Sequence, residues 1–254
     1  MNFPNESPEY RAARDRLLEK EIELRRQMEA VAEERRKLPQ GGMLKEDYVF
    51  DGLGPDGKPA RIRFSELFSP GRDTLILYNM MFPRYPTDPR PKPAEGAFAS
   101  LPHEDSPCPS CTALVNQWDG AAPHLEAAGF NFVIVANAPL ERLLTFARER
   151  GWRHLRFLSS AGSSFKRDYH GEDEAGHQVP LLQVFHRTEG GIRHFWSSEL
   201  HFAEAEPGQD ERAFGTLEPV WNFIDLTPAG RRPDWNVGLN DRGPEEAKPG
   251  LVGV

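Results

Sequence analysis

Two runs of nearly uninterrupted apolar residues constrain the fold of this chain more than any other feature. Residues 74–82 are Thr-Leu-Ile-Leu-Tyr-Asn-Met-Met-Phe, and residues 130–136 are Phe-Asn-Phe-Val-Ile-Val-Ala. A run of this length without polar alternation is typical of a central strand that is covered on both faces. Helices must therefore pack on both sides of a sheet, which indicates an α/β fold.

The elements between and after these runs alternate in a way that favours a partly parallel sheet. We predict a helix from residue 109 that is kinked at Asp119-Gly120, an amphipathic helix over 139–150 and a short strand over 155–158. Strands that alternate with helices imply right-handed crossovers and parallel pairing.

Two antiparallel hairpins and a last helix complete the predicted domain. Residues 48–50 and 61–64 are predicted to form the first hairpin. Residues 180–185 and 192–196 are predicted to form the second, around a Gly-Gly turn. Residues 217–226 are predicted to form the closing helix.

A long helix is predicted ahead of this domain. Ser7 and Pro8 supply a cap and a first-turn proline, and the helical pattern continues to Leu38. An apolar seam follows one side of the helix and comprises Leu17, Leu24, Met28, Val31 and Leu38. We interpret the segment as an amphipathic arm that lies on its own domain. The open alternative is a coiled coil that joins two copies into a homodimer.

Composition limits the partners and the compartment. The 254 residues carry a formal net charge of −8, which argues against nucleic acid or an anionic membrane as a partner. No apolar run is long enough to span a bilayer, and the N-terminus lacks the basic head and apolar core of a signal peptide. We therefore expect a cytoplasmic protein with an arm over residues 1–42, a domain over 43–230 and a disordered tail over 231–254.

The only two cysteines, Cys108 and Cys111, stand in Ser-Pro-Cys-Pro-Ser-Cys at the start of the predicted helix. If Cys108 caps the helix, Pro109 takes its first position, and both sulfurs lie on one face within reach of a disulfide. The free N–H groups and the dipole of a helix N-terminus lower the pKa of a thiol. The pattern therefore predicts a reactive dithiol, with Cys108 as the exposed nucleophile and Cys111 behind it.

Two other uses of the pair remain open at this point. A zinc site would need two more ligands, for which His103 and His177 are the nearest candidates, but no second cysteine pair supports it. Free cysteines can also be small core residues. We expect neither a metal nor a cofactor.

A proline-rich segment over residues 83–107 leads into the cysteines. It can form neither sheet nor helix, and loops at the ends of central strands commonly build sites in open α/β sheets. We predict that it forms a partial lid over Cys108. The alternative is an insertion with no role.

The order of elements around the Cys-Pro-Ser-Cys helix resembles the thioredoxin fold, a mixed α/β sheet flanked by helices. In that family a cis-proline opens the first strand of the hairpin beside the dithiol, and Pro180 matches its position. The resemblance thus implies Cys108, Cys111 and Pro180 as site residues. Pro107 stands where thioredoxins carry a tryptophan, which alters the surface that would dock a protein substrate.

The chain also resembles, over most of residues 7–235, a bacterial thioredoxin-like family of unknown function. The shared features are the N-terminal helix, a Met-Phe-Pro strand end, the Cys-Pro-x-Cys helix start and segments such as 165–170, 195–200 and 224–228. This resemblance implies a thioredoxin-like domain and brings no substrate with it.

We interpret the protein as a thiol–disulfide oxidoreductase in which Cys108 attacks a disulfide of a protein or a small molecule and Cys111 resolves the mixed disulfide. The first alternative is a thioredoxin-fold binding module whose cysteines do not turn over. The second is a thiol peroxidase or redox sensor. Leu101 and Asp105 stand where peroxiredoxins carry a proline and a threonine or serine, so that alternative lacks its motif.

Overall fold

The computed structural model describes residues 2–93, 95–207 and 215–228. The chain divides into two compact units, residues 1–41 and residues 42–254. The tail predicted over 231–254 lies outside the described residues. None of the described helices combines the length and the apolar character that a membrane crossing requires.

The first unit is built on one helix, α1 (Pro8–Arg36). Its N-cap is Ser7, whose side chain accepts the backbone N–H of Tyr10 at 3.2 Å, as the sequence predicts. No side chain of this helix is buried, and the apolar seam is exposed, with Leu24 at 60%. The homodimer through this helix stays a prediction.

The second unit begins with an antiparallel hairpin and continues with the elements that carry the cysteines. In chain order its helices, 3-10 turns and strands are β1 (Val49–Leu53), β2 (Pro59–Arg63), η1 (Phe64–Leu67), β3 (Thr74–Asn79), α2 (Pro109–Trp118), η2 (Asp119–Ala121), α3 (Ala122–Ala127), β4 (Phe130–Ala136), α4 (Leu140–Glu149), β5 (Arg156–Ser159), α5 (Phe165–Asp168), β6 (Leu181–Thr188), β7 (Gly191–Ser197), η3 (Glu199–Phe202), η4 (Gly215–Leu217) and α6 (Pro219–Asp225).

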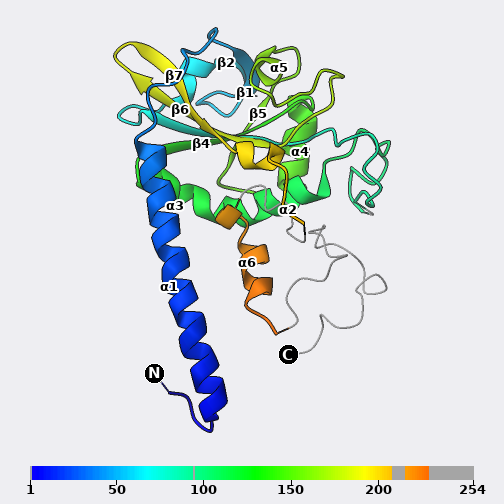
Figure 1. Cartoon of the computed structure of the whole chain (residues 1–254). Coiled ribbons are helices and arrows are strands. Elements are labelled where there is room, and N and C mark those ends of the chain that lie inside the picture. The colour runs from blue at the N-terminus through cyan, green and yellow to red at the C-terminus, as the bar shows by residue number, and fades with distance from the viewer. Residues whose placement is uncertain (1, 94, 208–214, 229–254) are drawn as a thin grey trace. The chain divides into compact units, whose positions relative to one another are not determined.

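The strands form one mixed sheet of seven, in the order β2-β1-β5-β4-β3-β6-β7. Strand β3 pairs parallel with β4 on one side and antiparallel with β6 on the other, and β4 pairs parallel with β5. The hairpin β6–β7 therefore forms one edge of the sheet, next to the parallel strands. Helices flank the sheet (Figure 1). This arrangement confirms the predicted thioredoxin-like fold.

The sheet separates two hydrophobic cores, because alternate side chains of a strand point to opposite faces. On β4, Phe132 and Ile134 join the core with α2, α3 and α4, whereas Val133 and Val135 join the core with η1 and α5. The side chains of strand β3 are divided between the two cores in the same way. The helical turn α5, which packs Phe165 into the second of these cores, was not predicted from the sequence.

Candidate redox site

The cysteines lie where the chain returns from β3 to the first core. After β3 the chain continues through Met80 and Met81, and the backbone N–H of Cys108 donates to the Met81 oxygen at 3.0 Å. Cys108 is the N-cap of α2, with an extended ψ of 129°, and Pro109 takes the first helical position. A proline there costs no hydrogen bond and ends the loop with a fixed backbone angle, so the predicted start of the helix is confirmed.

The two thiols are close together and well covered. Both are free, and the two cysteines approach to 3.6 Å. Cys108 is only 3% exposed and Cys111 only 2%. The expectation that Cys108 lies open to attack is therefore wrong for this conformation, because the proline-rich loop folds over it.

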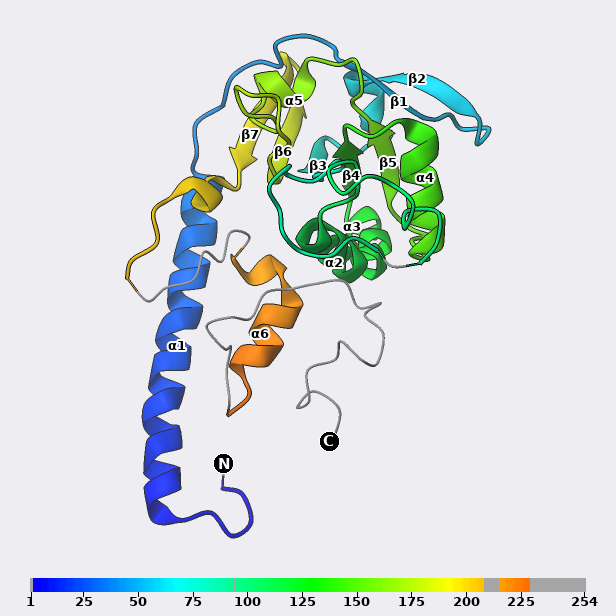
Figure 2. The same ribbon diagram turned by 90° about the vertical axis from the view of Figure 1, so that its right-hand side faces the viewer.

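Arg84 holds this loop closed from within. Arg84 is only 2% exposed. Its guanidinium donates to the backbone oxygens of Arg90 at 2.6 Å and Pro107 at 2.9 Å. The backbone N–H of Arg84 donates to the Ser106 oxygen at 2.8 Å, which ties the two ends of the loop together. The loop leaves the end of β3 and returns to the start of α2 (Figure 2), so its position agrees with the predicted lid.

The loop also brings a positive charge to the first sulfur. Arg90 Nη2 lies 3.5 Å from Cys108 Sγ. Asp88 fixes the guanidinium with two hydrogen bonds, at 2.9 Å from Nε and 2.7 Å from Nη2, and Ser110 on α2 accepts a third. Because Asp88 holds its plane, Arg90 is aimed at the thiolate without a large loss of side-chain freedom.

These contacts place the negative charge on the first cysteine and the proton on the second. The hydrogen bond from the Cys111 thiol is the main cause that lowers the pKa of Cys108 to about 6, and the Cys111 backbone N–H and Arg90 add to it against the effect of burial. Burial and the neighbouring Cys108 raise the pKa of Cys111 well above its ordinary value. The reduced site is therefore a thiolate at the cap and a thiol one turn into the helix.

Pro180 lies at the same end of the sheet as the cysteines. The first residue of β6, Leu181, pairs with Asn79, the last residue of β3. Pro180 thus precedes the strand that neighbours the dithiol, and its role in the site remains a prediction.

The expected cis geometry at Pro180 is wrong. The cis peptide bond in the described chain joins Phe82 to Pro83, and the Val179–Pro180 bond is trans. The trans isomer is the preferred form of an X–Pro bond. The backbone N–H of Val179 donates to the Gly171 oxygen at 3.0 Å, which fixes the residue before Pro180.

The histidines that were considered as zinc ligands have other partners. His103 lies 3.4 Å from the Arg84 guanidinium, and His177 contacts Asp173 at 3.1 Å. In the part of the chain that the structure describes, no three histidine, cysteine or acidic side chains gather as a metal site.

Four residues around the sulfurs escaped the sequence analysis: Arg84, Arg90, Tyr78 and Lys166. The two arginines lie in the loop before the cysteines, where a basic residue among prolines was a usable signal. Tyr78 is one apolar position among many in β3. Lys166 falls within the segment 165–170 that carries the family resemblance, but nothing there indicated its burial, because a lysine beside a phenylalanine in a polar stretch is usually exposed.

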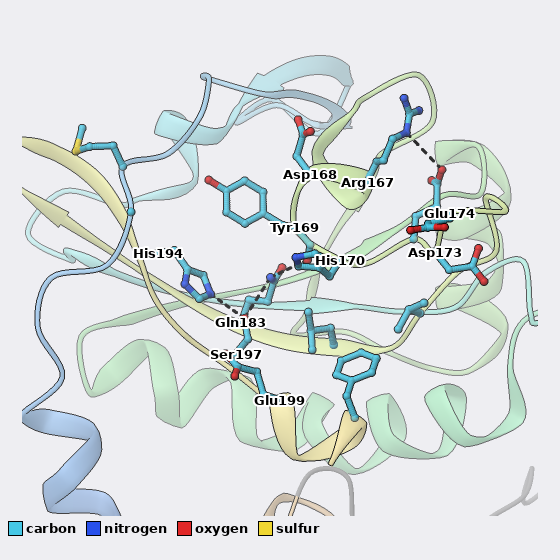
Figure 3. Close-up of a pocket in the computed structure, with 16 residues that line it drawn as sticks. Arg167, Asp168, Tyr169, His170, Asp173, Glu174, Gln183, His194, Ser197 and Glu199 are labelled. Carbon is cyan, nitrogen blue, oxygen red and sulfur yellow. Dashed lines mark hydrogen bonds and ion pairs between the residues drawn. The ribbon is translucent and has the colours of Figure 1, made fainter. Parts of the chain in front are cut away.

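A separate, open cavity of about 890 Å³ lies over β6 and β7 (Figure 3). Its floor carries Gln183, Ser197 and His194, with 2.7 Å between His194 Nε2 and Ser197 Oγ. Gln183 Oε1 accepts a hydrogen bond from Asn79 Nδ2 at 2.8 Å, so the cavity floor reaches the end of β3. The lining residues include no cysteine.

Comparison with known structures finds similarity to peroxiredoxins, at low identity. AhpC of Enterococcus faecalis is 12% identical, with 76% of this chain and 98% of that chain covered and a TM-score of 0.43. The mitochondrial 2-Cys peroxiredoxin of Plasmodium falciparum is 11% identical, with 76% and 97% covered and a TM-score of 0.41. No curated protein sequence matches the chain significantly.

Comparison of the sequence with known families gives a more specific result than comparison of structures. A family described as bacterial proteins of unknown function, DUF899, matches residues 2–242, and thus nearly the whole chain. This match bears out the resemblance to a bacterial family of unknown function. The chain is a member of the DUF899 family.

Proposed function

We propose that this protein is a thiol oxidoreductase whose Cys108 and Cys111 alternate between a dithiol and a disulfide. One observation carries the proposal: Cys108 caps α2, Arg90 Nη2 lies 3.5 Å from its sulfur, and Cys111 approaches to 3.6 Å. This arrangement is consistent with the lowered pKa of Cys108. The thiolate is the nucleophilic form of cysteine, and a resolving thiol within one helical turn makes the cycle intramolecular.

In the disulfide reaction, the Cys108 thiolate attacks one sulfur of the substrate disulfide. A Cys108–substrate disulfide forms, the substrate bond breaks, and the first substrate thiolate leaves and takes a proton from water. Cys111 then attacks the Cys108 sulfur, and the second substrate thiol departs with the proton that Cys111 loses. The protein is left with a Cys108–Cys111 disulfide and needs an external dithiol to return to its reduced form.

The cover over Cys108 favours a small substrate over a protein disulfide. At 3% exposure, the sulfur admits a compact oxidant after a small movement of the loop, whereas a folded protein would need the whole loop to open. A second candidate function follows from this burial, namely reduction of a small peroxide. The Cys108 thiolate would then attack one peroxide oxygen and break the O–O bond, which gives a sulfenic acid and, after protonation, an alcohol or water. The Cys111 thiol would attack the sulfenic sulfur, form the disulfide and release one water.

A single-turnover experiment tests the dithiol cycle. Reduced protein is mixed with a small disulfide, and separately with hydrogen peroxide, and the Cys108–Cys111 disulfide is measured by mass spectrometry. We expect one disulfide per chain with at least one of the two oxidants. The Cys111→Ser variant should stop at the mixed disulfide or the sulfenic acid.

The binding-module alternative predicts a different result. If the reduced protein leaves both oxidants unconsumed and keeps two free thiols, the proposal is rejected and the cysteines are structural. The relative rates with the two oxidants decide between disulfide and peroxide as the substrate class.

A further inference from the structure

The open cavity over β6 and β7 is a feature that the proposed function does not use. All of its lining residues belong to the second unit of the chain, and its volume of about 890 Å³ lies in the range of small-molecule sites. Its apolar lining includes Met43, Val179, Leu181 and Phe202. A cavity of this size that combines apolar surface with a few polar groups is typical of a ligand-binding site.

The polar side chains on the cavity floor are neutral and bonded to one another. Gln183, which is 1% exposed, accepts from Asn79 Nδ2 at 2.8 Å and donates to the Tyr169 backbone oxygen at 3.0 Å. It also donates to Ser197 Oγ at 3.3 Å, which lies 2.7 Å from His194 Nε2. Burial lowers the pKa of His194, so this ring is neutral near pH 7. The floor is thus fixed in place, and any recognition of charge falls to the other lining residues.

The charged lining residues are mostly acidic. Five carboxylates and one guanidinium line the cavity, namely those of Asp168, Glu172, Asp173, Glu174, Glu199 and Arg167. An anionic ligand would meet an excess of like charge here, whereas a cation would be attracted. In the described part of the chain, no three acidic, histidine or cysteine side chains gather as a metal site. The lining therefore favours an organic cation over an anion or a metal ion.

Three of the five carboxylates already have partners within the protein. Asp168 pairs with Lys45 at 2.6 Å, and Glu172 pairs with Arg167 at 3.8 Å. Asp173 accepts two backbone N–H groups of its own turn, at 2.9 and 2.8 Å. These three carboxylates stabilise the protein itself and are not free for a ligand.

Glu174 and Glu199 are different. Among the residues that the structure describes, neither side chain makes a hydrogen bond or an ion pair. Their backbones are nevertheless held, since residues 173–177 form a hydrogen-bonded turn around Glu174 and the N–H of Ser198 donates to the Leu182 oxygen at 2.9 Å. Figure 3 shows Glu174 and Glu199 on different segments and well apart. Two separated carboxylates without a partner thus line one cavity.

We propose that this cavity binds a linear aliphatic diamine or polyamine, with one ammonium group at Glu174, a second at Glu199 and the methylene chain against the apolar lining. Two separated carboxylates match a ligand with two separated ammonium groups, and Leu181 and Val179 match its methylene groups. The inference is independent of the dithiol, because no cysteine lines the cavity.

Calorimetric titration of the reduced full-length chain tests the proposal. Putrescine and spermidine are titrated at low ionic strength, where exposed charges are least screened. Butylamine has the chain of putrescine with one ammonium group, and magnesium chloride supplies a double charge without a chain. We expect saturable binding of putrescine about fivefold tighter than that of butylamine, because one ion pair distinguishes them, and weaker binding of magnesium.

Three variants test which carboxylates bind. Glu174→Gln and Glu199→Gln should each weaken putrescine binding about fivefold and abolish its advantage over butylamine. The matched control Glu189→Gln removes one carboxylate from the exposed β6–β7 turn outside the cavity, and its effect should stay below about twofold. All three side chains are exposed, so circular dichroism should show the wild-type fold in each variant.

Nuclear magnetic resonance locates the bound diamine. Putrescine should shift the amide resonances of Glu174 and Glu199 and the side-chain amide of Gln183, which lies on the cavity floor. Three results would overturn the proposal: no saturable binding of either amine, an equal loss of binding in Glu189→Gln, or resonance shifts confined to segments outside the cavity. An equal loss in the control would mean that the amines respond to net charge alone.

Discussion

The dithiol and the open cavity occupy different parts of the same domain and differ in what each one offers. The dithiol has the reactive group, a thiolate at a helix cap, but Cys108 is only 3% exposed. The cavity over β6 and β7 has about 890 Å³ of space, but its lining contains no thiol. The open cavity and the proposed site of chemistry are thus separated in this molecule.

The same contrast shows what controls reactivity at the dithiol. The cavity is open and is lined in part by residues of α5, β6 and β7, whereas the dithiol is covered by the loop of residues 83–107, which Arg84 bonds to itself. Access to Cys108 therefore depends on how often that loop opens. Local opening of a few hydrogen bonds is a common low-energy motion in proteins.

The largest expected effect is the loss of the nucleophile. Cys108→Ser should lower the rate of oxidant reduction about a thousandfold or more, whereas His194→Ala in the cavity should leave it within about twofold. Both rates are measured with the small disulfide and with hydrogen peroxide. A severe loss in His194→Ala with a mild one in Cys108→Ser would place the chemistry in the cavity instead.

An intermediate effect is expected when the loop loses its internal bonds. Arg84→Met removes two charged hydrogen bonds worth about 1.5 kcal/mol each, so the population with an open loop should rise about a hundredfold. Alkylation of Cys108 by a bulky maleimide should accelerate by that factor, while alkylation by a small reagent should change less. Equal rates in variant and wild type would mean that the loop does not limit access.

The smallest effect is expected from the charge beside the thiolate. Arg90→Met should raise the pKa of Cys108 by about one unit, because the guanidinium that favours the thiolate is lost. The thiolate population should fall only about twofold at pH 7 and about tenfold near pH 5, where the wild type is already largely protonated, and the difference should vanish above about pH 9, where both are ionised. Arg61→Met, which changes an exposed arginine of the β1–β2 hairpin, serves as the control.

Much of the fold could be predicted because its signals are local. The apolar run over residues 130–136 coincides with β4, and the pattern Cys108-Pro109 placed the cap and the first residue of α2 correctly. The kink at Asp119 also appears, as the 3-10 turn η2 between α2 and α3. Each of these depends on neighbours within a few positions of the chain.

The features that were missed depend on contacts between distant segments. The exposure of Cys108 is set by Arg84 and Arg90, which approach it only when the loop is folded. Lys166 is buried against every compositional expectation, because its partners Met80 and Gln178 come from other segments. No local pattern in the sequence encodes such burial.

The most direct test of the account is the pH dependence of Cys108 reactivity in the reduced, folded protein. Alkylation by iodoacetamide, followed at the Cys108 peptide by mass spectrometry, reports the thiolate of that residue alone. We expect a midpoint at about pH 6, set by the Cys111 hydrogen bond, the helix cap and Arg90. A midpoint at about pH 8.5, the value of an ordinary cysteine, would contradict it.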